Sequence, residues 1–376
     1  MHGHHHLFHF MKNKELTELY ATIALRSFAI ALSGVFIPIY LYQLGYPLAS
    51  IFLFFGLAAL FNLVSLFPTA KLSARWGLKH SILFSVPFLL VFFLLLFSLE
   101  QIRWPLALLA FFGGIQGSLF WFPYHTEFSK FSNKKKRGSQ VGVAKVIGAV
   151  FSAAGPLLGG VILALFGFKI LFSIVSLLLI ISVFPLFLTK DFHEPAGFSF
   201  QGFMKGHKLK NVLAYMGNGI EIRIATIIWP LFIFIFILNE QYVSLGTVAT
   251  IAFSFSLLST FVISRFSDLN RKLTLKVGTI GNSIVWIAKS FVVTPFQVFV
   301  ADAFYGITQT TINLPFDALS YDKAKKNERT RMILERELYI KLGAILFLII
   351  AALTVDKFIE IFRYGGPLAS LLQFLF

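Results

Sequence analysis

Apolar segments of about 20 residues follow one another along most of this 376-residue chain. A helix needs about 20 mostly apolar residues to cross the hydrocarbon core of a bilayer. That length predicts twelve membrane-spanning helices, at residues 16–43, 48–69, 80–99, 104–126, 140–166, 169–188, 211–238, 243–264, 273–293, 296–318, 332–354 and 358–376. The last segment is the weakest, because Arg363 and the run Gly365-Gly366-Pro367 interrupt it.

The composition agrees with a membrane protein. Hydrophobic residues make up 57% of the chain and charged residues 13%, whereas soluble domains have about 45–50% and about 25%. The chain contains no cysteine, which excludes disulfides, thiol catalysis and cysteine metal sites. The net charge of +16 lies in short loops between apolar segments. We therefore interpret it as a topology signal and an attraction to anionic lipid, and not as a nucleic-acid surface.

A repeat divides the chain into two halves. Gly114-Ile115, Pro123-Tyr124 and Arg137 are matched 192 residues later by Gly306-Ile307, Pro315-Phe316 and Arg329. We predict an all-α integral membrane fold of two pseudo-symmetric six-helix bundles, 16–188 and 211–376, joined by a polar linker, 189–210. Duplicated bundles are typical of secondary transporters, whose solute site lies between the repeats near the bilayer midplane.

Loop charges predict the orientation. The even-numbered loops are basic, whereas the odd-numbered loops hold little beyond Arg103, Lys169 and Lys357. Basic loops lie in the cytoplasm, so both termini are expected there, in a cell (inner or plasma) membrane. Five histidines in the tail 1–15 are either metal ligands or a tail without a structural role. The linker is either an interfacial helix or a loose tether.

Two loops carry incomplete copies of the same pattern. The first holds Leu72, Arg75, Gly77 and Lys79, with Ala74 between them, and the second holds Asp268 and Arg271-Lys272. Both resemble the loop signature G-x-L-a-D-R-x-G-R-K of the major facilitator superfamily (MFS), although Ala74 stands where the family has Asp. In that family the loop charges pair across the two halves and close the cytoplasmic side. The resemblance implies a gate of Arg75, Gly77, Lys79, Asp268 and Arg271, a transporter fold and a monomer in membrane lipid.

Two helix motifs are similar to those of the same family. Gly155, Pro156, Gly159 and Gly160 follow the pattern of the family's fifth helix, with Phe151 in place of one glycine. The family associates that motif with exporters, and close packing of small residues explains it equally well. Gly113 stands where the fourth-helix pattern R-x-x-Q-G has its arginine, so the proton-transfer role of that arginine is not carried over.

Charged and polar groups inside the spans are candidates for function, because their burial is costly. The cavity candidates share helix faces at multiples of a helical turn: Arg26, Ser33, Tyr40, Asn218, Glu221, Arg223, Trp229, Tyr305, Gln309 and Asn313. Glu221 and Arg223 lie about 200° apart around their helix, so only one of them faces the cavity squarely. Structural pairing between helices is the alternative for each charge. Lys289 and Arg363 are expected to snorkel, because their helices face lipid in the family layout.

These residues favour transport of a small solute by rocker-switch alternating access. Arg26 favours an anionic solute, unless Glu221 is its partner. A coupling ion such as H⁺ would titrate Glu221 or Asp302. The chain lacks HExxH, GxSxG and Walker motifs, so we expect no enzyme, cofactor or metal centre. The alternative is a non-transporting scaffold or receptor on the same fold.

Overall fold

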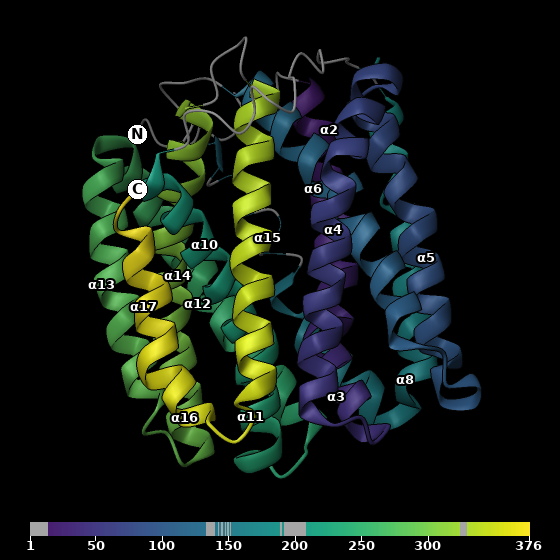
Figure 1. The fold of residues 1–376 in the computed structure, drawn as a ribbon, viewed down its shortest axis with the longest axis vertical. Coiled ribbons are helices and arrows are strands. Elements are labelled where there is room, and N and C mark those ends of the chain that lie inside the picture. Colours follow the sequence, from purple (N-terminus) through teal and green to yellow (C-terminus); the bar gives the residue numbers. More distant parts are fainter. Residues whose placement is uncertain are drawn as a thin grey trace, which may run out of the picture.

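The computed structural model describes residues 14–132, 152–188, 190, 191, 208–323 and 329–376, together with 140, 141, 143, 146, 148 and 150. In these residues the regular elements are all helical. Figure 1 shows long helices standing side by side, with the start of α2 and the end of α17 at the same end of the bundle. We call this the basic end, because Lys71, Arg75 and Lys79 lie at its loops, and the opposite end the far end. The predicted His-rich tail and most of the linker fall outside the described residues.

The N-terminal half begins with α2 (Lys14–Ser33), which continues through a short 3-10 turn, η2 (Gly34–Phe36), into α3 (Ile37–Gln43). Three long helices follow it: α4 (Leu48–Trp76), α5 (Leu78–Ile102) and α6 (Leu106–Phe131). Then come α8 (Gly155–Ile181) and the 3-10 turn η4 (Phe184–Phe187). Gly167 has a φ of 76° and a ψ of 179° inside α8, a conformation that glycine adopts without strain. The kink falls where the sequence predicts the boundary between the spans 140–166 and 169–188.

The C-terminal half contains α10 (Leu209–Arg223), η5 (Ile224–Ile228) and α11 (Trp229–Phe236) as one continuous rod. The long helices α12 (Tyr242–Leu269), α13 (Arg271–Lys289), α14 (Pro295–Lys323) and α15 (Arg329–Leu353) follow. The chain ends with α16 (Phe358–Glu360), η7 (Ile361–Gly365) and α17 (Gly366–Gln373).

Both η5 and η7 are single π-helical segments followed directly by a proline-containing helix. Pro230 and Pro367 occupy the first turn of those helices. Proline has no N–H and its ring clashes with the carbonyl four residues earlier. The wider π turn accommodates this loss.

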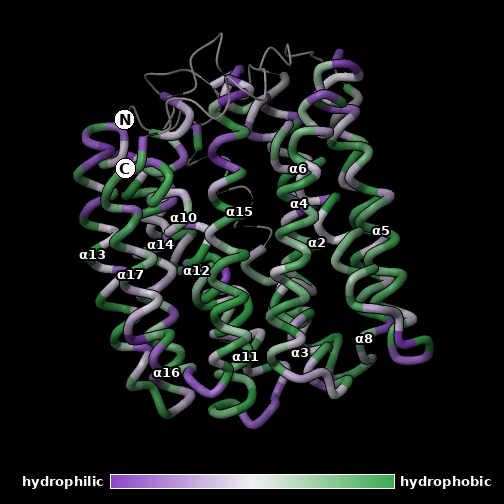
Figure 2. Tube along the Cα trace, viewed as in Figure 1, coloured by the Kyte–Doolittle hydropathy of each residue, from purple (hydrophilic) through white to green (hydrophobic). Residues whose placement is uncertain are grey.

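Seven helical rods among the described residues are long and apolar enough to cross a membrane. They are 17–43, Leu48–Trp76, Leu78–Ile102, Leu106–Phe131, Gly155–Ile181, Leu209–Phe236 and Tyr242–Leu269. The chain is therefore a multi-pass membrane protein. Figure 2 shows the same pattern, with apolar residues along the middle of the rods and hydrophilic residues gathered toward the two ends.

Helix α8 approaches its neighbours at glycines. A Cβ on Gly155 or Gly159 would lie 2.6 or 2.0 Å from atoms of α2, and one on Gly160 would lie 2.6 Å from the carbonyl of Tyr242 in α12. In return, a Cβ on Gly246 would lie 2.3 Å from the carbonyl of Pro156. These glycines therefore allow α8 to pack closely against α2 and α12.

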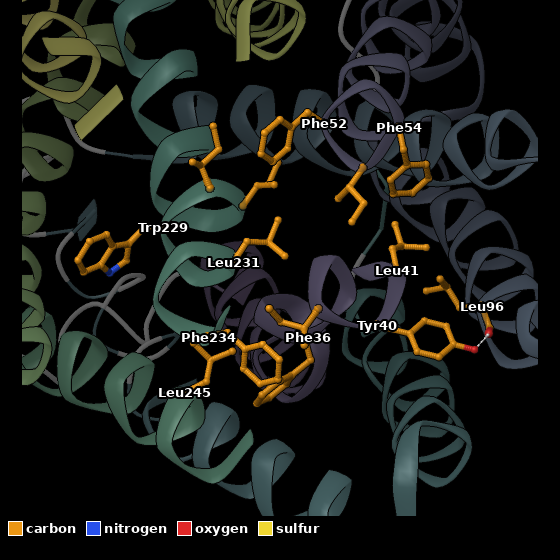
Figure 3. Close-up of a cluster of buried hydrophobic side chains, with 14 of the residues drawn as sticks. Phe36, Tyr40, Leu41, Phe52, Phe54, Leu96, Trp229, Leu231, Phe234 and Leu245 are labelled. Carbon is orange, nitrogen blue, oxygen red and sulfur yellow. Dashed lines mark hydrogen bonds between the residues drawn. The ribbon is translucent and has the colours of Figure 1, made fainter. Parts of the chain in front are cut away.

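Apolar clusters join the halves at both ends. At the far end, one cluster includes Phe36, Phe52, Trp229 and Phe234 (Figure 3), and the Phe52 and Phe358 rings lie 6.3 Å apart. At the basic end, a second cluster combines side chains of both halves, among them Phe120, Phe128, Leu314, Tyr321 and Leu334. Arg26, Gln116, Glu221 and Arg223 lie on the rods between these two layers.

Candidate functional site

Arg26 lies on α2 and turns toward α6. Its Nη2 donates to Oε1 of Gln116 at 2.7 Å, and its guanidinium lies 3.8 Å from the ring centroid of Phe120. The side chain is buried, at 3% exposure, and its Nε has no hydrogen-bond partner. Among the described residues no carboxylate forms an ion pair with it. The N-terminal half thus holds a desolvated guanidinium that retains unused donors.

Arg223 occupies the last position of α10, immediately before the π turn η5. Its buried Nε also lacks a hydrogen-bond partner. The charge of Arg223 acts on Lys341 of α15, and Nζ of Lys341 lies 3.8 Å from Oε2 of Glu337. The C-terminal half therefore contributes a second guanidinium with a hydrogen-bond donor, Nε, that has no partner.

Glu221 points away from Arg223, into the C-terminal half. It is fully buried and accepts hydrogen bonds from Tyr305 Oη at 2.8 Å, Asn282 Nδ2 at 3.3 Å and Trp286 Nε1 at 3.4 Å. Gln309 Nε2 donates to its other oxygen. Four neutral donors from α13 and α14 stabilise the ionised carboxylate. Glu221 is therefore held by the C-terminal half, and the prediction that only one of Glu221 and Arg223 faces the cavity squarely stays a prediction.

Lys289 and Asp302 form an ion pair beside that network. Nζ of Lys289 lies 2.9 Å from Oδ1 of Asp302 and 4.1–4.5 Å from the ring centroids of Tyr305, Trp229 and Trp286. Trp229 Nε1 donates to Oδ2 of Asp302 at 2.9 Å. The prediction that Lys289 snorkels to the headgroups was wrong. Lys289 is 1% exposed. Helix α14 follows the far-end turn and places Asp302 next to the Lys289 ammonium.

The structure brings some predicted cavity residues together and separates others. Glu221, Trp229, Asp302, Tyr305 and Gln309 share one network. Two other candidates bond within their own half: Tyr40 donates to the Leu96 carbonyl at 3.0 Å and Asn218 donates to Gln373 Oε1 at 3.1 Å. Ser33 is buried, and Asn313 is partly buried.

Asp191 takes part in the first loop pattern, which sequence reasoning missed. Its carboxylate accepts from the backbone N of Lys79 at 2.8 Å and of His80 at 3.0 Å, and it pairs with His80 Nδ1 at 2.6 Å. A Cβ on Gly77, whose φ is +102°, would lie 2.1 Å from this carboxylate. Asp191 therefore supplies an acid to the loop in which Ala74 stands where the family pattern has Asp. The contact is non-local, and only the acid's position just after the sixth predicted span could have suggested it.

Three of the other predicted gate residues, Lys79, Asp268 and Arg271, form pairs inside their own halves. Lys79 Nζ binds Glu18 of α2, and Arg75 is exposed. In the second loop, Arg271 binds Asp322 and lies 3.6 Å from Asp268. These pairs fix each loop to its own bundle.

Contact across the halves at the basic end runs through His125 of α6. Its Nδ1 lies 2.6 Å from the hydroxyl of Tyr321 in α14, and its Nε2 lies 3.7 Å from Glu337 in α15. Arg336 binds Glu337 and also Asp317, at 2.9 Å. We call these five residues the basic-end latch. His125 is buried, at 7% exposure.

Contact across the halves at the far end is made by Tyr242, whose hydroxyl donates to Oε1 of Gln43. The Tyr242 ring also lies 6.4 Å from that of Phe36. The latch and this far-end contact lie on opposite sides of Arg26 and Arg223.

Comparisons with solved structures identify this architecture. The human organic anion transporter MFSD10 (TETRAN) superposes with a TM-score of 0.70 at 10% identity, over 96% of this chain and 97% of that one. A bacterial homologue of the iron transporter ferroportin, in its outward-facing state, gives 0.69 at 12% identity over 96% and 97%. The Escherichia coli fucose:proton symporter FucP gives 0.66 at 14% identity over 96% and 95%. Identities this low show the fold alone.

Sequence comparison assigns the family. No curated protein matches the chain. The sequence model of the Major Facilitator Superfamily matches residues 19–239, which is more than half of the chain and extends from the first helix of one bundle into the other. Together with the paired bundles, this match shows that the chain belongs to the Major Facilitator Superfamily.

Proposed function

We propose that the protein is a secondary active transporter that carries a small anionic solute by rocker-switch alternating access. The observation that carries this proposal is the pair Arg26 and Arg223, one from each half, each with a buried Nε that lacks a partner. A desolvated guanidinium is best stabilised by a carboxylate or phosphate. An anion that binds both arginines would connect the two halves.

Glu221 supports this assignment, because it is not the partner of Arg26. Its hydrogen bonds come from Tyr305, Gln309, Asn282 and Trp286. The internal carboxylate that would cancel the preference for an anion is therefore occupied elsewhere.

Alternating access is supported by separate contacts at the two ends of the bundle. The halves meet through Gln43 and Tyr242 at the far end and through His125 and Tyr321 at the basic end. Either contact can open while the other stays closed, which is the requirement for two states that a bound solute can shift.

We infer a topology of twelve crossings with both termini in the cytoplasm. The seven apolar rods supply the first of these, with the Gly167 kink dividing α8. Helices α13, α14, α15 and the rod from α16 to α17 complete the second bundle. The lower hydropathy of α13 and α14 follows from the polar residues that form the Glu221 and Lys289 networks, and that of α15 from Glu335, Arg336, Glu337 and Lys341.

Binding of anions to the purified protein tests the proposal. We expect a panel of small carboxylates and phosphorylated sugars to include a ligand that raises the melting temperature. Arg26→Gln should weaken its binding by about 10- to 100-fold, since a hydrogen bond to a charged group contributes about 1.5–3 kcal/mol. Lys169→Gln, which removes an exposed cation that pairs with Glu100, is the matched control. Flux of the ligand into liposomes distinguishes transport from a receptor that only binds.

The opposite results have clear meanings. Stabilisation by cations or neutral solutes alone, unchanged in Arg26→Gln, contradicts the anion assignment. Binding without flux would favour the scaffold or receptor alternative.

We propose a proton as the coupling ion, bound in the Glu221 network. Glu221 and Asp302 are both buried, and they face a single buried cation, Lys289. With all three groups ionised the network carries one net negative charge, which one proton neutralises. Glu221→Gln fixes the neutral form. We expect this variant to lose solute accumulation driven by a pH gradient in liposomes while solute exchange at equal pH persists. Accumulation that survives the substitution excludes Glu221 from coupling.

A further inference from the structure

Four lysines gather at the basic end of the C-terminal half, away from the transport pathway. Lys210 in the first turn of α10 and Lys272 and Lys276 in the first turns of α13 line a cavity of about 160 Å³ together with Leu275, Phe374, Leu375 and Phe376. Lys323, the last residue of α14, lies beside it, with its Nζ 3.2 Å from the ring centroid of Phe376. We call this group the lysine pocket.

Aromatic and amide groups position the ammoniums of the lysine pocket. Nζ of Lys276 lies 4.7 Å from the ring centroid of Phe374, and Nζ of Lys323 donates to Asn211 Oδ1 at 2.9 Å. Cation–π contacts and a neutral acceptor hold the side chains in place without cancelling their charge.

The lysine pocket carries a net positive charge, because its four ammoniums have one acidic neighbour in the described residues, Glu335, which acts on Lys323. Within the described parts of the chain, no carboxylate forms an ion pair with Lys210, Lys272, Lys276 or Lys323. Lys323 lies beyond the predicted span 296–318. Its burial, followed by the charge of Lys210, lowers its pKa to about 8; the carboxylate of Glu335 opposes this shift, and Lys272 and Lys208 add to it. Crowded ammoniums of this kind are stabilised by an anion with several acceptor oxygens, such as a phosphate.

An apolar track begins beside the lysine pocket and runs along α13. Leu273, Val277, Ile280 and Ile284 are spaced four, three and four residues apart, so they share one face of the helix, and each is at least 49% exposed. Figure 1 shows α13 at the outer edge of the bundle, beside α17. A free phosphate would leave this track unused, whereas the acyl chain of a phospholipid would cover it.

We propose that the lysine pocket is a binding site for the headgroup of an anionic phospholipid, whose acyl chain lies along the α13 track. The inference rests on the membrane location and on the loop-charge orientation, which places the basic end in the cytoplasmic leaflet, where anionic lipids give a negative surface potential. It does not depend on the anionic solute of the proposed function. The site belongs to helices that also carry Glu221 and Asn282, so the lipid braces the outer wall of that network.

Lipid retention by the full-length protein tests the site. We would measure bound phosphatidylglycerol and phosphatidylcholine by native mass spectrometry after release from detergent micelles. Wild-type protein should retain phosphatidylglycerol preferentially. The variant Lys272→Gln/Lys276→Gln should lose about fivefold in affinity for each lysine removed, and Lys272→Arg/Lys276→Arg should restore the preference.

The matched control is Lys71→Gln/Lys190→Gln, which removes two exposed lysines from the basic end of the other half. It should retain phosphatidylglycerol as the wild type does. Equal retention by the Lys272→Gln/Lys276→Gln variant and the wild type, or equal loss in the control, overturns the proposal. A competition arm separates the two sources of phosphate: glycerol phosphate should leave the lipid bound, and its complete displacement of the lipid would assign the pocket to a soluble phosphate instead.

Discussion

Lys289 is held by one carboxylate and three aromatic rings inside the C-terminal half. An ammonium in this position is stabilised only by its immediate contacts, because little water competes for it. The same reasoning applies to Asp302, which accepts from Trp229 as well as from Lys289. Neither charge is tolerable without the other.

The pair therefore predicts a specific pattern of stability. Lys289→Met should destabilise the protein by about 3–5 kcal/mol, because it leaves Asp302 as a buried, uncompensated charge. Adding Asp302→Leu should recover most of that loss. Thermal unfolding in detergent measures both, with Arg363→Gln as a control cation on η7. If the single and double variants are equally unstable, the ion pair does not account for the effect.

At the scale of elements, α6 is the helix of the N-terminal half that reaches the C-terminal half through the basic-end latch. The latch includes a hydrogen bond between His125 and Tyr321, next to a chain of charged groups that begins at Glu337. In the proposed alternating access this hydrogen bond would break when the basic end opens.

Tyr321→Phe should shift the population toward the state that is open at the basic end by about fivefold, since a hydrogen bond contributes about 1 kcal/mol. Spin labels on Lys71→Cys and Arg265→Cys, exposed positions on different halves, report the separation by pulsed electron resonance. Tyr20→Phe is the control, because the Tyr20 hydroxyl bonds to the Gln140 carbonyl inside one half. Identical distance distributions in Tyr321→Phe and wild type would remove the latch from the gate.

At the scale of the whole molecule, the orientation of the bundle can be measured directly because the chain has no cysteine of its own. A cysteine at Gln241, in the far-end turn before α12, should react with a membrane-impermeant maleimide in intact cells. One at Lys71, at the basic end, should react only after permeabilisation. The reverse pattern would invert the topology.

Sequence alone predicted the apolar rods and only part of the networks. Seven rods of the described residues are long and apolar enough to cross a membrane, and hydropathy predicts such rods because lipid imposes a length on every crossing. It predicted Glu221 as a candidate because a charge within a span is costly, and Tyr305 and Gln309 because helical spacing puts them on one face of their helix. It missed the Lys289–Asp302 pair and Asp191, because a partner on another helix or linker depends on how the rods pack, which periodicity does not encode.

The π turns η5 and η7 have a mechanical consequence. A π turn contains one residue more than the α-helix would use over the same rise. If η5 regained α geometry, everything beyond it would rotate by about 100° relative to α10. Trp229 would then swing away from Asp302 while Glu221, on the other side of the turn, kept its orientation. The rod of α10, η5 and α11 can therefore rotate at η5, between Glu221 and Trp229. The rod of α16, η7 and α17 has a similar point of rotation at η7.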